Sequence, residues 1–241
     1  MSGAETTPGG PDSGRGERER IRRIYEETYL ENRYRSRWSG IGPHLIHEGK
    51  WEILRPLLAD LGYARPGARV LDLGAGSGVD CEELDRFGWD RAGIIAIDLL
   101  RGDVGRARTR LPWLSGAVGD AARLPILDAA VDLVFQSTMI SSVLEDRLRA
   151  AIYAEAARVL KRGGAFISYD TRYPNPWNRY TRPVRPGELR RAFPGWSLRL
   201  TSLTLLPPLV RRLAPLSTAL CRAGERFPPL RSHLLACAVK P

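Results

Sequence analysis

Acidic and small residues stand at the points where the predicted strands of this chain end. The apolar run Val70-Leu71 leads to Asp72, and the glycine-rich segment 74–78 (GAGSG) follows. Later strand-like runs also lead into polar residues, namely Asp98, Asp120, Gln136, Tyr169 and Asp170. Parallel strands in an open α/β sheet bring their carboxyl ends to one edge, where ligands bind. We therefore expect these side chains to surround a single ligand.

The glycine-rich segment suits a cofactor that must approach the backbone closely. Glycines at 74 and 76 carry no side chain, so loop N–H groups, including that of Ala75, can reach the amino-acid end of a cofactor. Asp72 can hold the ammonium group of that end, directly or through water. The NAD fingerprint G-x-G-x-x-G needs a third glycine where this chain has Val79, so the spacing favours S-adenosylmethionine.

The later strand ends suit the nucleoside part of the same cofactor. Asp98 can accept two hydrogen bonds from the ribose hydroxyls, and Leu99 or Leu100 can cover one face of the adenine. Asp120 can accept from the adenine amino group while the N–H of Ala121 donates to a ring nitrogen. A single acid at a strand end also serves as a helix cap, and a single glycine as a turn residue. The ordered set, however, favours a cofactor site.

Five segments together resemble a known family. VLDLGAGSG, IDLL, GDAARLP, VDLVFQS and RVLKRGGAF are similar, in order and spacing, to the class I S-adenosylmethionine-dependent methyltransferases of the bacterial small-molecule type. The resemblance covers residues 66–170. It implies an α/β fold with a Rossmann-like, doubly wound sheet of seven strands, mostly parallel, with the last strand antiparallel beside the sixth. It also implies cofactor contacts at Gly74, Gly76, Asp98, Asp120 and Gln136.

One departure from related enzymes bears on the acceptor. Enzymes that methylate nucleic-acid bases or glutamine amides often carry an Asn/Asp-Pro-Pro-aromatic motif after the fourth strand. This chain has Gln136-Ser137-Thr138-Met139 there, which disfavours those acceptors. We expect methyl transfer to a small molecule, oxygen-directed, in glycan, lipid or natural-product biosynthesis. An RNA or protein methyltransferase and a non-catalytic S-adenosylmethionine-binding protein are the alternatives.

The chain is expected to divide into a disordered tail (1–16), an N-terminal helical cap (17–65) and an S-adenosylmethionine-binding methyltransferase domain (66–241). Predicted strands cover 68–73, 92–97, 115–118, 131–136, 164–169, 196–206 and 232–239. Predicted helices cover 17–32, 44–62, 78–88, 101–111, 145–161 and 187–193. Gly163-Gly164 is expected to end the helix over 145–161, because glycine commonly follows the last helical turn.

The helical cap is expected to form a lid over the cofactor. Tyr34, Arg35 and Trp38 are predicted to contact the acceptor, together with Arg172 from a proline-rich loop. Tyr25 lies on the apolar face of the first helix and is assigned to the core.

Methyl transfer is an in-line displacement that depends mainly on alignment, although an oxygen nucleophile can need a base. Asp170 is our first choice for that base, with Tyr169 beside it at the same strand end. His44 or His47 could instead reach in from the cap. The alternative for Asp170 is a structural pairing with Arg172.

Composition restricts the partners. The net charge is +10, but 34 of the 37 basic residues are arginines spread along the chain, which indicates codon usage rather than a nucleic-acid patch. The three cysteines lack disulfide or metal spacing, so we expect no metal and a cytoplasmic location, with no signal-peptide pattern at the start.

Four leucines share a helical face within 207–224, where they could contact a membrane surface, an apolar substrate or the sheet: Leu209, Leu213, Leu216 and Leu220.

Overall fold

A seven-stranded sheet forms the centre of the computed structural model, which describes residues 14–30, 40–176 and 178–241. The strand order is β3-β2-β1-β4-β5-β7-β6. The strands are β1 (Val70–Leu73), β2 (Ile94–Asp98), β3 (Ser115–Val118), β4 (Val131–Ser137), β5 (Leu160–Thr171), β6 (Ser197–Leu205) and β7 (Arg231–Val239). Strands β1 to β5 pair in parallel, and β7 lies antiparallel between β5 and β6. The predicted mostly parallel sheet with an antiparallel last strand is confirmed.

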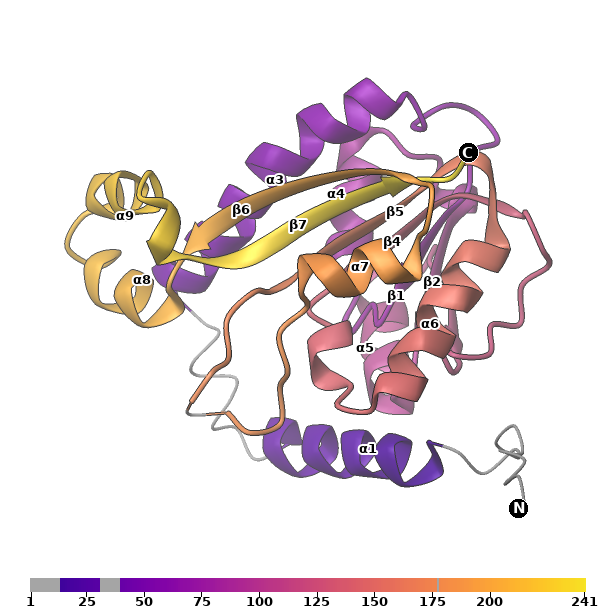
Figure 1. Cartoon of the computed structure of the whole chain (residues 1–241), viewed down its shortest axis with the longest axis horizontal. Helices are drawn as coiled ribbons and strands as arrows, with labels where there is room; N and C mark the ends of the chain where they lie inside the picture. Colours follow the sequence, from indigo (N-terminus) through magenta and orange to yellow (C-terminus); the bar gives the residue numbers. More distant parts are fainter. Residues whose placement is uncertain (1–13, 31–39, 177) are drawn as a thin grey trace, which may run out of the picture.

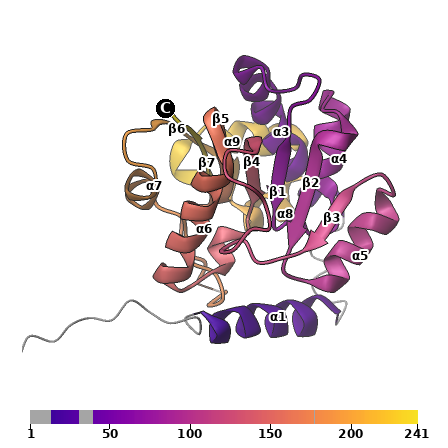
Figure 2. The same cartoon turned by 90° about the vertical axis from the view of Figure 1, so that its right-hand side faces the viewer.

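Helices cover both faces of the sheet (Figures 1 and 2). The helices are α1 (Arg15–Leu30), α3 (Ile41–Leu61), α4 (Val79–Phe87), α5 (Arg101–Arg110), α6 (Asp146–Val159), α7 (Pro186–Ala192), α8 (Pro207–Leu213) and α9 (Thr218–Glu225). The described residues also form the short 3-10 turns η1 (Arg91–Gly93), η2 (Ile140–Ser142) and η3 (Pro228–Leu230). Residues on α3, α4 and α5 pack on one face, and residues on α6 and α7 pack on the other.

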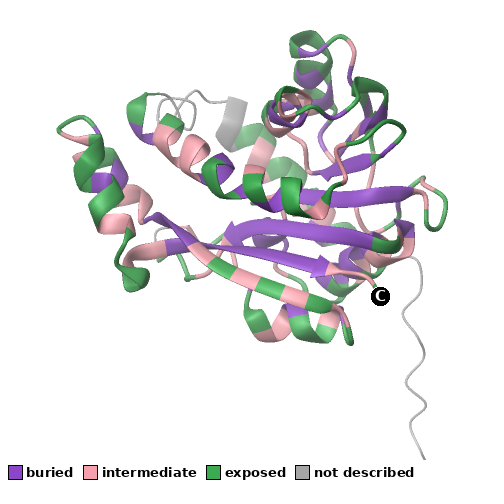
Figure 3. Cartoon of the chain, turned by 90° about the horizontal axis from the view of Figure 1, so that it is seen from above, coloured by how far each residue is buried: buried purple, intermediate pink, exposed green. Residues whose placement is uncertain are grey.

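Alternation along the strands explains these two cores. Successive strand residues point to opposite faces, so Val70 joins the α3–α4 layer while Leu71 joins the α6 layer. All four residues of β1 are buried, as expected for a central parallel strand covered on both sides. Figure 3 shows the long strands of the sheet mostly in the colour of buried residues. The strand is therefore fixed from both faces, and the loop that follows it starts from a rigid position.

The expected end of α6 at Gly163-Gly164 is wrong. The helix ends at Val159, and Leu160 already belongs to β5, so both glycines lie inside the strand. A Cβ atom on Gly164 would lie 2.9 Å from the carbonyl oxygen of Asp132, so glycine allows β5 to approach the β4 backbone at a register shift. Sequence alone could not separate this role from a helix terminator, because both roles favour glycine.

Helix α1 lies across the edge of the sheet where β3 and β4 end (Figures 1 and 2). The buried carboxylate of Glu17 accepts a hydrogen bond from the N–H of Leu144. Arg20 donates to the carbonyl oxygen of Ser142 at 2.6 Å, and the Tyr25 hydroxyl lies 2.6 Å from Ser142 Oγ. The helix is thus held by polar contacts to the segment between β4 and α6.

The segment 207–224 contains two short helices joined by a turn, so its four leucines do not share one face. Leu209 and Leu213 pack against a small cluster that includes Leu205 of β6 and Leu45 of α3. Leu216 and Leu220 are exposed, by 78% and 53%. Packing on the sheet is thus confirmed for the first half only. No helix among the described residues is long and apolar enough to cross a membrane.

Candidate functional site

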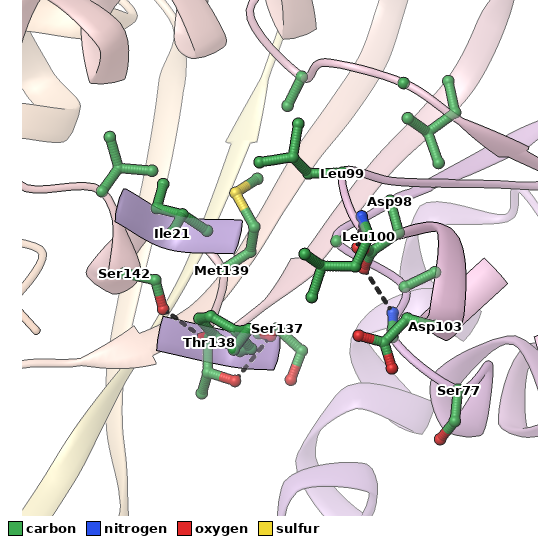
Figure 4. Close-up of a pocket in the computed structure, with 18 of the residues that line it drawn as sticks. Ile21, Ser77, Asp98, Leu99, Leu100, Asp103, Ser137, Thr138, Met139 and Ser142 are labelled. Carbon is green, nitrogen blue, oxygen red and sulfur yellow. Dashed lines mark hydrogen bonds between the residues drawn. The ribbon is translucent and has the colours of Figure 1, made fainter. Parts of the chain in front are cut away.

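A cavity of about 840 Å³ lies at the carboxyl ends of β1 to β4. Its walls come from the glycine-rich loop, the ends of β2 and β3, the segment after β4 and the inner face of α1. In Figure 4, Ser77, Asp98 and Asp103 lie on one side, with Ile21 and Met139 on the other. The cavity occupies the edge at which the sequence predicts the ligand.

The glycine-rich loop turns sharply at the end of β1. Gly74 has a φ of +70°, and its N–H donates to the carbonyl oxygen of Ile97 at 2.8 Å. A Cβ atom on Gly74 would lie 2.5 Å from Cγ of Met139, so only glycine fits. Gly76 has a φ of +54° and no atom within 4 Å of the place a Cβ would take. Gly74, Ala75 and Gly76 all line the cavity, as predicted for a loop that a cofactor approaches.

Asp98 ends β2 and joins that strand to the loop. One carboxylate oxygen accepts from the N–H of Gly76 at 2.9 Å, and the other accepts from the N–H of Leu100 at 2.8 Å. Burial raises the pKa of Asp98, and the two backbone hydrogen bonds oppose that rise. Each oxygen keeps a further lone pair, so the carboxylate can accept additional hydrogen bonds at the cavity wall.

Asp120 lies beyond β3 and contacts α1. Its carboxylate accepts from Nε of Arg18 at 2.6 Å and from the N–H of Ala122 at 2.9 Å. Arg18 and Asp120 both line the cavity, and so does Ala121. The residue predicted to bind the adenine amino group therefore already has a cationic neighbour from α1. No sequence pattern indicates that pair, because the two residues are 102 positions apart.

Apolar side chains cover the space near Asp98 and Asp120. Leu99 and Leu100 line the wall that follows β2, as predicted. Ile21 of α1 and Met139 of the β4–α6 segment come from the opposite side (Figure 4). Apolar surfaces on both sides suit a flat ring such as adenine.

A buried group of charges lies beneath the glycine-rich loop. Lys50 of α3 donates to both oxygens of Asp80, at 2.6 and 2.8 Å, and to Oγ of Ser137 at 3.1 Å. Burial raises the pKa of Asp80, but Lys50 outweighs that effect and holds the pKa below its usual value. Asp80 and Ser137 line the cavity, whereas Lys50 stands behind them. No sequence pattern indicates this group, because its members come from three separate elements, α3, α4 and β4.

Asp72 lies below the loop rather than at the cavity wall. Its carboxylate is 1% exposed and accepts from the Cys81 thiol at 3.2 Å. Burial, together with repulsion by Asp80, raises the pKa of Asp72 to about 8. Its predicted contact with the cofactor ammonium stays a prediction.

Gln136 is also buried away from the cavity. Its side-chain oxygen accepts from the N–H of Met139 at 3.0 Å, and its nitrogen donates to Ser168 and to Asp170. This arrangement fixes the segment after β4, which includes Thr138 at the unusual φ of +58°. A direct cofactor contact by Gln136 stays a prediction.

The two residues predicted to be catalytic do not line the cavity. Asp170 has no exposed surface, and its carboxylate accepts from the N–H groups of Ser141 (3.0 Å) and Thr171 (2.8 Å). Tyr169 is buried beside His233, with ring centroids 4.6 Å apart, and its hydroxyl lies 2.7 Å from Thr204 Oγ1. The geometry gives both residues structural contacts, and their catalytic role stays a prediction.

The predicted acceptor residues are mostly outside the described part of the chain. Tyr34, Arg35 and Trp38 fall within residues 31–39, which the structure does not describe. Arg172 contacts the carbonyl oxygen of Pro228 at 3.5 Å and lies over the Tyr173 ring, away from the cavity.

Tyr25 and His47 line the cavity from the helical cap. The core assignment of Tyr25 is therefore wrong: the residue is half-buried against the cavity and contacts Ser142. Burial and the nearby Lys50 lower the pKa of His47. A core face and a cavity face have the same helical periodicity, so the sequence could not separate them.

His47, Glu48 and Glu83 bring potential metal ligands within 4.8 Å of one another. The Glu83 carboxylate, however, accepts from Arg55 at 2.8 Å and from Arg86 at 2.6 Å. Two guanidinium groups therefore supply the positive charge that a cation would bring. The expectation of no metal stays a prediction.

The residues at the cavity fit S-adenosylmethionine. The open backbone at Gly76 leaves room for its amino-acid part, and the carboxylate of Asp98 can accept hydrogen bonds from its ribose. The apolar side chains of Leu99 and Leu100 can cover its adenine. The cavity also falls within the usual range for small-molecule pockets, roughly 300–1,000 Å³.

Comparison with known sequences agrees with this geometry. Residues 70–164 match the family described as a methyltransferase domain. A demethylmenaquinone methyltransferase from Renibacterium salmoninarum is 33% identical over 66% of this chain and 63% of its own length. A malonyl-[acyl-carrier protein] O-methyltransferase from Methylococcus capsulatus is 37% identical over 47% of this chain and 41% of its own length. The chain thus spans less than two thirds of these curated relatives.

A solved structure shares the fold of nearly the entire chain. A geranyl diphosphate C-methyltransferase from Streptomyces coelicolor, determined with S-adenosyl-L-homocysteine, superposes with a TM-score of 0.68 at 17% identity. The match covers 96% of this chain and all of that one (100%). S-adenosylmethionine is the cofactor indicated by the family, the fold and the cavity. The match over residues 70–164, together with the fold, supports a class I S-adenosylmethionine-dependent methyltransferase domain in this chain.

Proposed function

We propose that this chain transfers a methyl group from S-adenosylmethionine to an oxygen atom of a small organic molecule. The observation that carries the proposal is the cavity at the carboxyl ends of β1 to β4, where Gly76, Asp98 and Asp120 lie together. We assign the loop at 74–76 to the amino-acid end, Asp98 to the ribose, and Leu99, Asp120 and Ala121 to the adenine. S-adenosylmethionine supplies a methyl group on a positively charged sulfur that a nucleophile can attack.

The covering of the cavity by α1 supports a small acceptor. Arg18, Arg20 and Tyr25 tie α1 to the sheet edge on the far side of the cavity from the glycine-rich loop. A folded RNA or protein would have to displace this helix before one of its groups reached the interior. A small molecule needs only a local opening. The two similar enzymes named above act, by their names, on demethylmenaquinone and on malonyl-[acyl-carrier protein], and neither name points to RNA. We propose glycan, lipid or natural-product biosynthesis as the general setting.

We propose His47 as the base for an oxygen nucleophile. His47 lines the cavity, and its lowered pKa keeps the imidazole neutral near pH 7, the form that accepts a proton. Its Nε2 lies 3.7 Å from a carboxylate oxygen of Glu83, which can orient the ring. Asp170 lacks comparable access, because its carboxylate is fully buried.

A comparison of two variants tests the choice of base. His47→Gln should lower kcat by about 10²–10⁴-fold, the usual contribution of a general base, and leave S-adenosylhomocysteine affinity unchanged. Asp170→Asn should act mainly on folding, which a thermal melt measures. A larger loss of kcat in a well-folded Asp170→Asn variant than in His47→Gln would return the role to Asp170.

The transfer itself is tested with S-adenosylmethionine labelled in its methyl group. The label should enter the small-molecule fraction of an extract from the source organism, in an ether or ester linkage, and not its RNA or protein. Asp98→Ala provides the cofactor-deficient control. Efficient labelling of RNA or protein would support that alternative, and binding of S-adenosylhomocysteine without any transfer would support a non-catalytic binding protein.

A further inference from the structure

The helix α9 presents apolar side chains to solvent at one end of the molecule. Leu220 is 53% exposed, Leu216 in the turn before the helix is 78% exposed, and Phe227 just after it is 59% exposed. Leu220, Ala223 and Phe227 are spaced three and four residues apart, which places them on one side of a helix. The N–H of Phe227 donates to the carbonyl oxygen of Gly224, so the winding continues to that residue.

The opposite side of the helix pair is already used for packing. Cys221 of α9 and Val210 of α8 are buried in a cluster with Leu205 of β6. The Ser217 hydroxyl accepts from the N–H of Leu220 and caps α9. These contacts fix the orientation of α9, so the outer side chains cannot turn inward without breaking the cluster. The exposed residues are therefore a stable outer surface of the fold.

Exposed arginines occur in the same segment of the chain as these apolar side chains. Residues 207–230 contain four arginines and one glutamate. Arg211, Arg212 and Arg226 are exposed, and Arg222 is paired with Glu52 at 2.8 Å. The glutamate, Glu225, accepts from the N–H of Thr204 and is half-buried. Apolar side chains bordered by cations match the chemistry of an anionic lipid surface, where acyl chains lie below negatively charged headgroups.

We propose that Leu216, Leu220, Ala223 and Phe227, with Arg211, Arg212 and Arg226, form a surface that binds anionic lipid bilayers. The helices α8 and α9 lie at one end of the molecule, beyond the ends of β6 and β7 (Figures 1 and 3), so a flat bilayer can approach them. A second copy of the chain is a poorer occupant, because two such surfaces would bring arginines of like charge together. This surface does not depend on the proposed transfer reaction.

Co-sedimentation with vesicles tests the proposal on the full-length protein. Vesicles of phosphatidylcholine mixed with an equal part of phosphatidylglycerol should bind the protein, and vesicles of phosphatidylcholine alone should bind it much more weakly. The triple variant Leu216→Ser, Leu220→Ser, Phe227→Ser should lower the partition coefficient by at least about tenfold, since each large apolar side chain contributes to insertion. Arg211→Gln with Arg212→Gln should lower it about fivefold per charge removed.

Leu127→Ser provides the matched control, because Leu127 is 81% exposed but lies outside this segment, and its binding should be unchanged. Thermal melts and S-adenosylhomocysteine calorimetry verify that each variant is folded; if the triple variant is unfolded, the arginine pair and Phe227→Ser alone carry the test. Equal vesicle binding by all variants overturns the proposal. Concentration-dependent self-association that the triple variant abolishes, without vesicle binding by the wild type, also overturns it and identifies a second copy as the occupant.

Discussion

Asp98 connects two backbone segments through one carboxylate. It accepts from Gly76 in the loop after β1 and from Leu100 at the start of α5. In our assignment the same carboxylate also binds the ribose, so it shapes the cavity wall and offers the polar contact to the ligand. Loss of the carboxylate therefore removes both the support of the cavity wall and the proposed contact with the ribose.

Asp98→Ala should lower S-adenosylhomocysteine affinity by about 1–3 kcal/mol or more, the cost of leaving buried polar partners unsatisfied. Asp98→Asn should lose less, because its amide oxygen still accepts one backbone hydrogen bond. Titration calorimetry measures both. Asp85→Ala, on the outer side of α4, serves as the control and should bind normally. Unchanged affinity in a folded Asp98→Ala protein would refute the assignment.

The sequence predicts which residues stand at the strand ends. It predicts only in part whether their side chains point into the cavity or into the core. Asp98 and Asp120 reach the cavity, whereas Gln136 and Asp170 point into the core and bind each other. Neighbouring strand residues face opposite ways, so a shift of one position decides whether a side chain reaches a ligand. The Arg18–Asp120 pair depends on how α1 docks, which local sequence does not specify.

At the scale of elements, the glycine-rich loop depends on what lies above it. The close approach of Gly74 to Met139 comes from the β4–α6 segment, whereas Gly76 faces open space. Both have positive φ, so an alanine at either position carries backbone strain of about 1–2 kcal/mol. Only at Gly74 does a steric clash add to the strain.

Gly74→Ala should therefore lower the free energy of unfolding more than Gly76→Ala does, as measured by urea denaturation. Removing the opposing Cβ and Cγ together with Met139→Gly should restore part of the loss in Gly74→Ala and none of it in Gly76→Ala. Equal losses in the two single variants, or no rescue by Met139→Gly, would contradict the predicted clash.

The docking of α1 depends on the ionisation of Glu17. Burial raises the pKa of Glu17, but hydrogen bonds from Arg20 and Leu144 outweigh it and hold the pKa below the ordinary value of 4.5. Because the pKa of Glu17 is lower when α1 is docked, docking is fully favoured at pH values above the ordinary pKa of 4.5. It weakens as the pH falls through the lower pKa of the docked state. The protection factors of the α1 amides, which correct for the pH dependence of intrinsic exchange, should thus fall at about pH 4 and below.

Glu17→Gln should remove this acid dependence, while Glu19→Gln, at an exposed position of the same helix, should retain it. Hydrogen exchange followed peptide by peptide separates α1 from the sheet. Acid-induced exchange of the same size in Glu17→Gln and wild type would show that another group controls docking.

At the scale of the whole molecule, Asp72 links the stability of the fold to pH. Its pKa is raised from 3.8 to about 8, mainly by burial and then by Asp80. Between these values the folded protein holds a proton that the unfolded chain releases. The free energy of unfolding therefore falls as pH rises through this range. Lys50, which pairs with Asp80, limits the effect.

Asp72→Asn should remove this contribution, so its stability relative to wild type should increase steadily from about pH 4 to about pH 8. Thermal melts across this range measure the difference. Asp60→Asn, at an exposed carboxylate, should run parallel to wild type. A constant difference between Asp72→Asn and wild type would mean that Asp72 is ionised throughout.

The position of β7 has a consequence for how the protein is made. This strand follows all the others in the sequence, yet it lies between β5 and β6, and its central residues 232–238 are buried. Translation adds β6 before β7, so β5 keeps an open edge and β6 has no sheet partner until β7 follows. Open strand edges attract other chains. Nascent chains stalled before residue 231 should therefore recruit chaperones, and those released with β7 should not.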